Sequence, residues 1–133
     1  MDIKEKKAHF AHNMLLNGGF SYWGNCEMNY RDDQENVTYD TIPESYTIVD
    51  RNDEFPDEEA DSTTFSPVEL ADAFIDYAEK ILEDNRNGVS VNPYFKEWAK
   101  HTIAYDFDDA LCCDADVVDC AVQYAMFGRT VYA

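Results

Sequence analysis

Residues 66–85, SPVELADAFIDYAEKILEDN, decide the fold, because they carry both a helix start signal and a helical period. Ser66 stands at the N-cap, Pro67 at the first helical position and Glu69 three residues after the cap, which is the arrangement of a capping box. Apolar residues then recur at helical spacing, at Leu70, Phe74, Ala78 and Ile81. This pattern predicts a long amphipathic helix that ends at about Asn85, before Asn87-Gly88.

One helix is expected before this element and two after it, each with its own boundary signal. Residues 2–17 precede Gly18-Gly19, and glycine readily takes the left-handed conformation that ends a helix. Asn92-Pro93 opens a helix that runs through Tyr105, with a short helical turn after it at 106–111. A last helix is expected over residues 114–127, with Gly128 as its stop.

The segment between the first helix and Ser66 has the character of β-structure. Three runs, 20–30, 37–42 and 46–50, are rich in β-branched and aromatic residues. Because the separators are typical of hairpin loops, an antiparallel three-stranded sheet is the simplest arrangement. Residues 52–64 are acidic, contain a proline and lack an apolar period, so we interpret them as a loop.

These elements predict a single α+β domain over residues 1–133: an N-terminal helix, a three-stranded antiparallel sheet, then three C-terminal helices. A chain of this length buries roughly two-thirds of its unfolded surface. Hydrophobic residues make up 45% of the chain and aromatic residues 14%, too many for a disordered acidic tail. A packed core is therefore expected.

Charge is the unusual property of the chain. Twenty-eight acidic residues against ten basic ones give a formal net charge of -18 and a sequence pI of about 4.2. Self-repulsion at this density opposes folding, so the charge calls for another explanation. One explanation is solubility or adaptation to salt. The other is binding to a positively charged partner, whereas direct contact with DNA or RNA is disfavoured by phosphate repulsion.

The predicted helix at 66–85 gives the charge a regular arrangement. Five acids follow one another at intervals of three and four residues and line one helix face: Glu69, Asp72, Asp76, Glu79 and Glu83. Neighbours lie about 4.5 to 6 Å apart along the axis, comparable with phosphates along one nucleic-acid strand. Only Lys80 is expected near this acidic row, and Lys4, Lys6 and Lys7 are expected outside the binding face. The alternative is an ordinary solvated helix face.

A second acid-rich region precedes this helix. Residues 27–61 hold thirteen acids and two arginines. We expect part of it to extend the partner-binding surface of the row, namely Asp53, Glu54, Asp57, Glu58 and Glu59.

Metal and catalytic motifs are weak. Cys112, Cys113 and Cys120 with His9 and His12 lack the paired spacing of a zinc site. The run from Asp106 to Asp109 lacks the glycine and closing glutamate of a calcium loop. His101 with Cys112 or Cys113 resembles a base and nucleophile, but such pairs arise easily by chance. We therefore predict no metal, no cofactor and no enzymatic activity.

The first residues, MDIKEKKAHF, lack the apolar core of a secretory signal, and no run of 18 apolar residues is present. We expect a cytoplasmic protein with reduced thiols and no membrane partner, located in the host cytoplasm if a phage encodes it.

In size, charge and the acidic row from Glu69 to Glu83, the chain resembles the small acidic DNA-mimic inhibitors of phages and mobile elements, such as anti-restriction and anti-CRISPR proteins. Members of this class share no common fold. The resemblance implies an inhibitor that acts by occupancy. It would bind the nucleic-acid-binding surface of a basic protein, such as a Cas effector, a restriction enzyme or a DNA-repair enzyme.

Two other functions stay open. An immunity protein that neutralises a basic nuclease toxin is also small, acidic and α+β, and binds beside the active site. A regulator or assembly factor would carry its charge for solubility only. The oligomeric state is open as well, since a homodimer would double the acidic surface.

Overall fold

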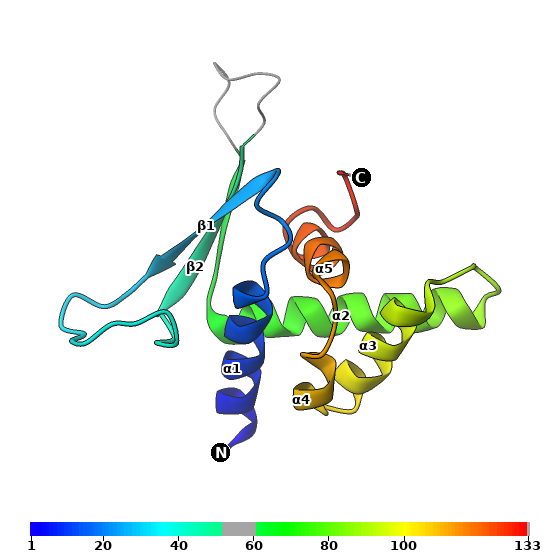
Figure 1. The fold of residues 1–133 in the computed structure, drawn as a ribbon, viewed down its shortest axis with the longest axis horizontal. Coiled ribbons are helices and arrows are strands. Elements are labelled where there is room, and N and C mark those ends of the chain that lie inside the picture. The colour runs from blue at the N-terminus through cyan, green and yellow to red at the C-terminus, as the bar shows by residue number, and fades with distance from the viewer. Residues whose placement is uncertain (52–60, 133) are drawn as a thin grey trace.

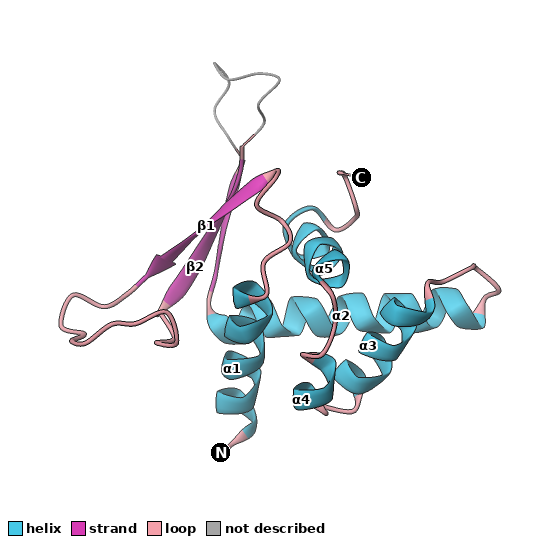
Figure 2. Cartoon of the chain, viewed as in Figure 1, coloured by secondary structure: helices cyan, strands magenta, loops and turns pink. Residues whose placement is uncertain are grey.

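The computed structural model describes residues 1–51 and 61–132. The elements follow in the order α1 (Ile3–Leu16), β1 (Gly24–Asn29), β2 (Ser45–Asp50), β3 (Ser62–Phe65), α2 (Pro67–Arg86), α3 (Pro93–Ile103), α4 (Phe107–Ala110) and α5 (Ala115–Phe127). Figures 1 and 2 show the strands to one side of the helices, with α2 running across the helical part. The predicted α+β class is confirmed. Four helices follow the sheet in the described ranges, because the turn expected at 106–111 forms α4.

The sheet is antiparallel in the order β1-β2-β3, as a three-stranded meander. Alternate residues of β2 point into the core, and Tyr46 and Ile48 are fully buried there. The other face carries mostly polar side chains, with Thr47 between Glu27 of β1 and Thr64 of β3. This face is exposed or half-buried, which fits an antiparallel sheet with one wet side.

The third strand is not the one that the sequence predicts. Residues 37–42 form a turn in which the Thr41 amide donates to the Thr38 carbonyl at 3.0 Å, while Val37 and Tyr39 stay exposed. Instead, residues 62–65, assigned above to a loop, pair with β2. The alternation in 37–42 buries nothing, whereas Thr63 and Phe65 place their side chains on the inner face beside the core.

The helix boundary signals are confirmed. Ser66 and Glu69 form the complete capping box, and Asn92 caps α3 by accepting from the Tyr94 amide at 2.8 Å. Gly18, which follows the C-cap Asn17 of α1, and Gly128, the C-cap of α5, both take positive φ angles, of 70° and 72°. None of the helices in the described ranges is long and apolar enough to cross a membrane.

Helix α2 is the centre of the helical layer. It packs against α1, α3 and α5 (Figure 1), and buries Leu70, Phe74 and Ala78 completely. Aromatic contacts continue the core away from α2: the Phe10 ring of α1 meets Phe74 edge-on at 6.2 Å and stacks on Phe107 of α4 at 4.3 Å. Because α1, α3 and α5 pack on one side of α2, its opposite side is exposed in the part of the chain that the structure describes.

A buried polar network ties α5 to the start of the sheet. Asp119, 8% exposed, accepts hydrogen bonds from the Trp23 indole at 2.7 Å, the Tyr22 hydroxyl at 2.7 Å and the Gln123 amide at 2.9 Å. Gln123 in turn accepts from the backbone amides of residues 131 and 132 at 2.8 Å. The network satisfies these polar groups inside the core and fixes α5 relative to the sheet.

Candidate functional site

The acidic row of α2 is exposed along its whole length. The structure places all five predicted carboxylates, Glu69, Asp72, Asp76, Glu79 and Glu83, among the exposed residues of the helix. At about 100° per residue they fall within about 80° of the helix circumference, and from first to last they span about 21 Å. The sequence therefore identified one face of one rigid element, and the described fold leaves that face uncovered.

The first residue of the row has a structural task. The Glu69 carboxylate accepts a hydrogen bond from the Ser66 amide at 2.9 Å, while the Ser66 hydroxyl accepts from the Glu69 amide at 3.1 Å. The bond to the Ser66 amide lowers the pKa of Glu69, so its carboxylate stays ionised. Glu69 thus holds the start of the helix and is less available to a partner.

The second residue of the row is paired with α1, and here the sequence expectation is wrong. The Lys7 ammonium lies 2.8 Å from the Asp72 carboxylate and 5.7 Å from the centre of the Tyr105 ring. Lys7 was expected outside the binding face, but α1 packs across α2 and brings its lysine to the row. Contacts between helices that are 65 residues apart in the chain carry no local signal in the sequence.

The remaining three carboxylates define the open half of the row: Asp76, Glu79 and Glu83. Lys80, expected to dilute the row, lies 3.7 Å from Asp84, which is outside the row. Within the described ranges, no lysine, arginine or histidine forms an ion pair with the open half of the row. Three exposed carboxylates of one sign therefore stand on a helix whose other side is fixed in the core.

The second predicted group of partner-binding acids cannot be placed beside the row. Asp53, Glu54, Asp57, Glu58 and Glu59 all lie outside the described residues.

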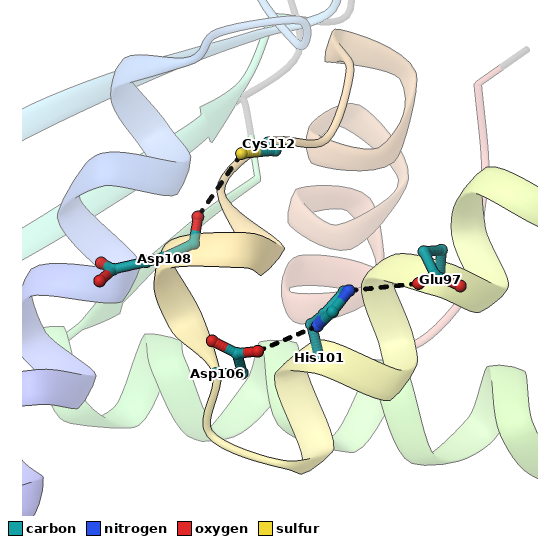
Figure 3. Close-up of polar contacts among 5 residues, drawn as sticks. All are labelled: Glu97, His101, Asp106, Asp108 and Cys112. Atoms are coloured by element: carbon teal, nitrogen blue, oxygen red, sulfur yellow. Dashed lines mark hydrogen bonds and ion pairs between the residues drawn. The ribbon is translucent and has the colours of Figure 1, made fainter.

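A second cluster, which the sequence patterns did not predict, lies where α3 ends and α4 begins. Figure 3 shows the His101 ring between two carboxylates. Its Nε2 atom lies 3.2 Å from Glu97 Oε1, and its Nδ1 atom lies 3.3 Å from Asp106 Oδ2. Asp109 completes the cluster: one ligand atom each from His101, Asp106 and Asp109 lie within 4.8 Å of one another. The hydrogen bond to the neighbouring Asp106 carboxyl group raises the pKa of Asp109.

Tyr105 explains why this cluster has no sequence signature. Its φ angle is +58°, a conformation that glycine favours and tyrosine rarely adopts. The left-handed residue reverses the chain after α3 and turns Asp106 back toward His101. No glycine marks the turn, so neither the reversal nor the cluster could be read from residue types.

The histidines and cysteines considered for zinc have other surroundings. His12 is buried, with its ring nitrogens 2.7 Å from the Tyr46 hydroxyl and 2.6 Å from the Tyr39 carbonyl. His101 and Cys112 do line one pocket. The hydrogen bond of the Cys112 thiol, however, goes to the Asp108 carbonyl at 3.7 Å (Figure 3), so the geometry shows no nucleophile and base in contact.

Comparison with known protein families, with curated proteins and with solved structures finds no match. We therefore infer the function from the residues and their geometry.

Proposed function

We propose that this protein is an inhibitor that binds the positively charged nucleic-acid-binding surface of another protein and blocks it by occupancy, as a DNA mimic. The observation that carries the proposal is the open half of the row. Its members, Asp76, Glu79 and Glu83, are exposed and have no ion pair within the described ranges. The binding needs no catalytic step and no cofactor.

Rigidity supports this proposal. The residues on the opposite side of α2, among them Phe74 and Ala78, are fully buried against three other helices. The carboxylates are therefore held in a fixed row before any partner arrives, which reduces the entropy lost on binding. Arginine and lysine side chains that normally bind phosphates form charge-assisted hydrogen bonds with carboxylates as well.

The sign of the charge also supports binding over solubility. Like charges three and four residues apart mildly destabilise a helix, and a surface that only needs solubility intersperses lysines. In α2 the one lysine pairs with Asp84, and among the residues that the structure describes Glu79 and Glu83 have no ion pair. A basic groove releases counterions when it binds DNA, and it would release them in the same way when it binds this row of carboxylates.

The experiment is affinity capture from a nuclease-treated bacterial lysate at low salt. The test variant reverses the open half of the row, as Asp76→Lys, Glu79→Lys and Glu83→Lys. It leaves the contact between Lys7 and Asp72 intact, so the packing of α1 on α2 is not disturbed. The natural sequence should retain a nucleic-acid-binding protein that the test variant loses.

The matched control reverses three exposed acids in the segment between β1 and β2, as Asp32→Lys, Glu35→Lys and Asp40→Lys. It changes the net charge by the same amount but leaves α2 unchanged, so it should retain the partner. If the control loses the partner as fully as the test variant does, net charge and not the row is responsible. Equal capture by all three proteins would also contradict the proposal.

A further inference from the structure

We propose that His101, Asp106 and Asp109 form a binding site for a divalent transition-metal ion such as Mn²⁺ or Zn²⁺. One ligand atom from each of the three residues lies within 4.8 Å of the others. Neighbouring ligands about 2.1 Å from a common ion are about 3.0–3.4 Å apart, so the side chains would have to rotate and draw closer together to coordinate it. One imidazole nitrogen and two carboxylates form a recognised donor set for such ions.

Glu97 gives His101 the orientation of a metal ligand. Metal-binding histidines almost always donate their second ring N–H to a carboxylate or carbonyl, which fixes the tautomer and the ring plane. Here the Glu97 carboxylate lies 3.2 Å from Nε2, on the side of the ring away from the cluster (Figure 3). With a proton on Nε2, the lone pair of Nδ1 would be free for an ion, which would replace the hydrogen bond between Nδ1 and Asp106 at 3.3 Å.

The cluster brings two carboxylates together, and the basic group paired with Asp106 is the His101 imidazole itself. Within the described ranges, neither Asp106 nor Asp109 forms an ion pair with a lysine or arginine. Asp108, the acid between them, points its carboxylate away from His101 (Figure 3), so it is not part of the donor set. A divalent ion would offset the repulsion between the two carboxylates.

A pocket lies beside the cluster. It measures about 540 Å³, and its walls include His101, Asp109 and Glu97. A three-ligand metal site keeps open coordination positions, and this pocket gives water or a small anion room to fill them.

The oxygen-rich donor set guides the choice of probe. Mn²⁺ binds carboxylates and imidazole and has little affinity for thiols, so Cys112, which lines the same pocket, does not compete for it. Free Mn²⁺ is counted by its electron paramagnetic resonance signal during a titration at physiological ionic strength, where diffuse counterions are screened. We expect one saturable site on the 133-residue chain.

Substitutions test which residues bind the ion. His101→Asn and Asp109→Asn should each weaken Mn²⁺ binding by at least about tenfold, and Glu97→Gln by about tenfold through the orientation of the ring. His9→Asn and Asp40→Asn are the matched controls, since both residues are exposed and neither belongs to the cluster. Both control variants should bind Mn²⁺ as the natural sequence does.

Circular dichroism establishes that each variant is folded before its titration. Equal affinity of the natural sequence, His101→Asn and Asp109→Asn would overturn the proposal, as would binding without saturation in all of them. Loss of binding in His9→Asn with retention in His101→Asn would place the ion elsewhere and also overturn it.

Discussion

Lys7 decides which part of the acidic row is available. Its ammonium, with a side chain 18% exposed, takes the Asp72 carboxylate and leaves the row open only from Asp76 onward. The row was predicted correctly as a set of exposed acids, because helical spacing alone determines which residues share a face. Its division into a paired and an open half could not be predicted, because it depends on how α1 packs on α2.

Removal of this lysine should extend the open half of the row. We expect Lys7→Gln to increase the affinity for an oligoarginine peptide, by at most about fivefold, because one more carboxylate becomes free. The free energy of unfolding should fall by less than about 1 kcal/mol, since the pair is partly exposed. Calorimetric titration with the peptide and urea unfolding measure the two effects.

Lys4→Gln is the control for this prediction, because it changes the charge of the same helix equally. Lys4 is exposed and forms no ion pair within the described ranges. If Lys4→Gln and Lys7→Gln bind the peptide equally well, the contact between Lys7 and Asp72 does not reduce the affinity of the row for the peptide.

The cysteines should differ sharply in reactivity. Burial raises the pKa of Cys26 and of Cys113 to about 11, whereas Cys112 is exposed. Because the thiolate is the reactive form, iodoacetamide at about pH 8 should label Cys112 first. Labelling of Cys26 and Cys113 should rise about tenfold per pH unit until the pH approaches 11.

Mass spectrometry of the labelled peptides measures the three rates, and urea-unfolded protein serves as the control, in which all rates should converge. Labelling of Cys26 or Cys113 as fast as Cys112 in the folded protein would show that the two thiols are not buried.

At the scale of the elements, α5 depends on its buried carboxylate. Asp119→Ala removes the acceptor of the Trp23 indole and the Gln123 amide, both of which are buried. The Trp23 indole is left without an acceptor, which costs about 1–3 kcal/mol, whereas the Gln123 amide keeps its bond to the Tyr132 carbonyl at 3.3 Å. With about 1 kcal/mol for the lost bond to Gln123, we expect the free energy of unfolding to fall by about 2–4 kcal/mol. Urea denaturation followed by tryptophan fluorescence measures this loss.

Asp116→Ala is the matched control, because Asp116 is an exposed acid in the first turn of the same helix. Its effect should stay below about 1 kcal/mol, the size of a helix-dipole interaction. Similar losses in the two variants would mean that the Asp119 network does not hold α5 in place.

The elements themselves were largely predictable. Capping residues such as Ser66, Asn92 and Gly128 mark helix ends by local chemistry, and the structure has the helices where these signals place them. The third strand was not predictable, because β-pairing depends on partners far along the chain. Residues 62–65 pair with β2 despite their weak local pattern, while the better alternation of 37–42 is left in a turn.

For the whole molecule, composition predicts how the protein interacts with charged partners, but it does not predict where side chains come together in a cluster. A net charge of -18 predicts repulsion from nucleic acid and attraction to basic proteins. It does not predict where carboxylates converge closely enough to bind an ion. That property arises at His101, where a left-handed Tyr105 folds two segments against each other.

The binding proposal and the metal proposal are independent at this scale. The open half of the row lies on α2, and the proposed metal site lies where α3 meets α4. Loss of Mn²⁺ binding in Asp109→Asn should therefore leave partner capture unchanged, and reversal of the row should leave Mn²⁺ binding unchanged.

Competition with DNA tests the central claim most directly. The basic protein captured through the open half of the row is immobilised with this protein bound, and duplex DNA is added in increasing amounts. A DNA mimic shares its binding surface with DNA, so we predict that DNA displaces it completely and that the Asp76→Lys, Glu79→Lys, Glu83→Lys variant never binds. A stable complex that holds the partner, the DNA and this protein together would contradict mimicry and point instead to an immunity protein that binds beside the active site.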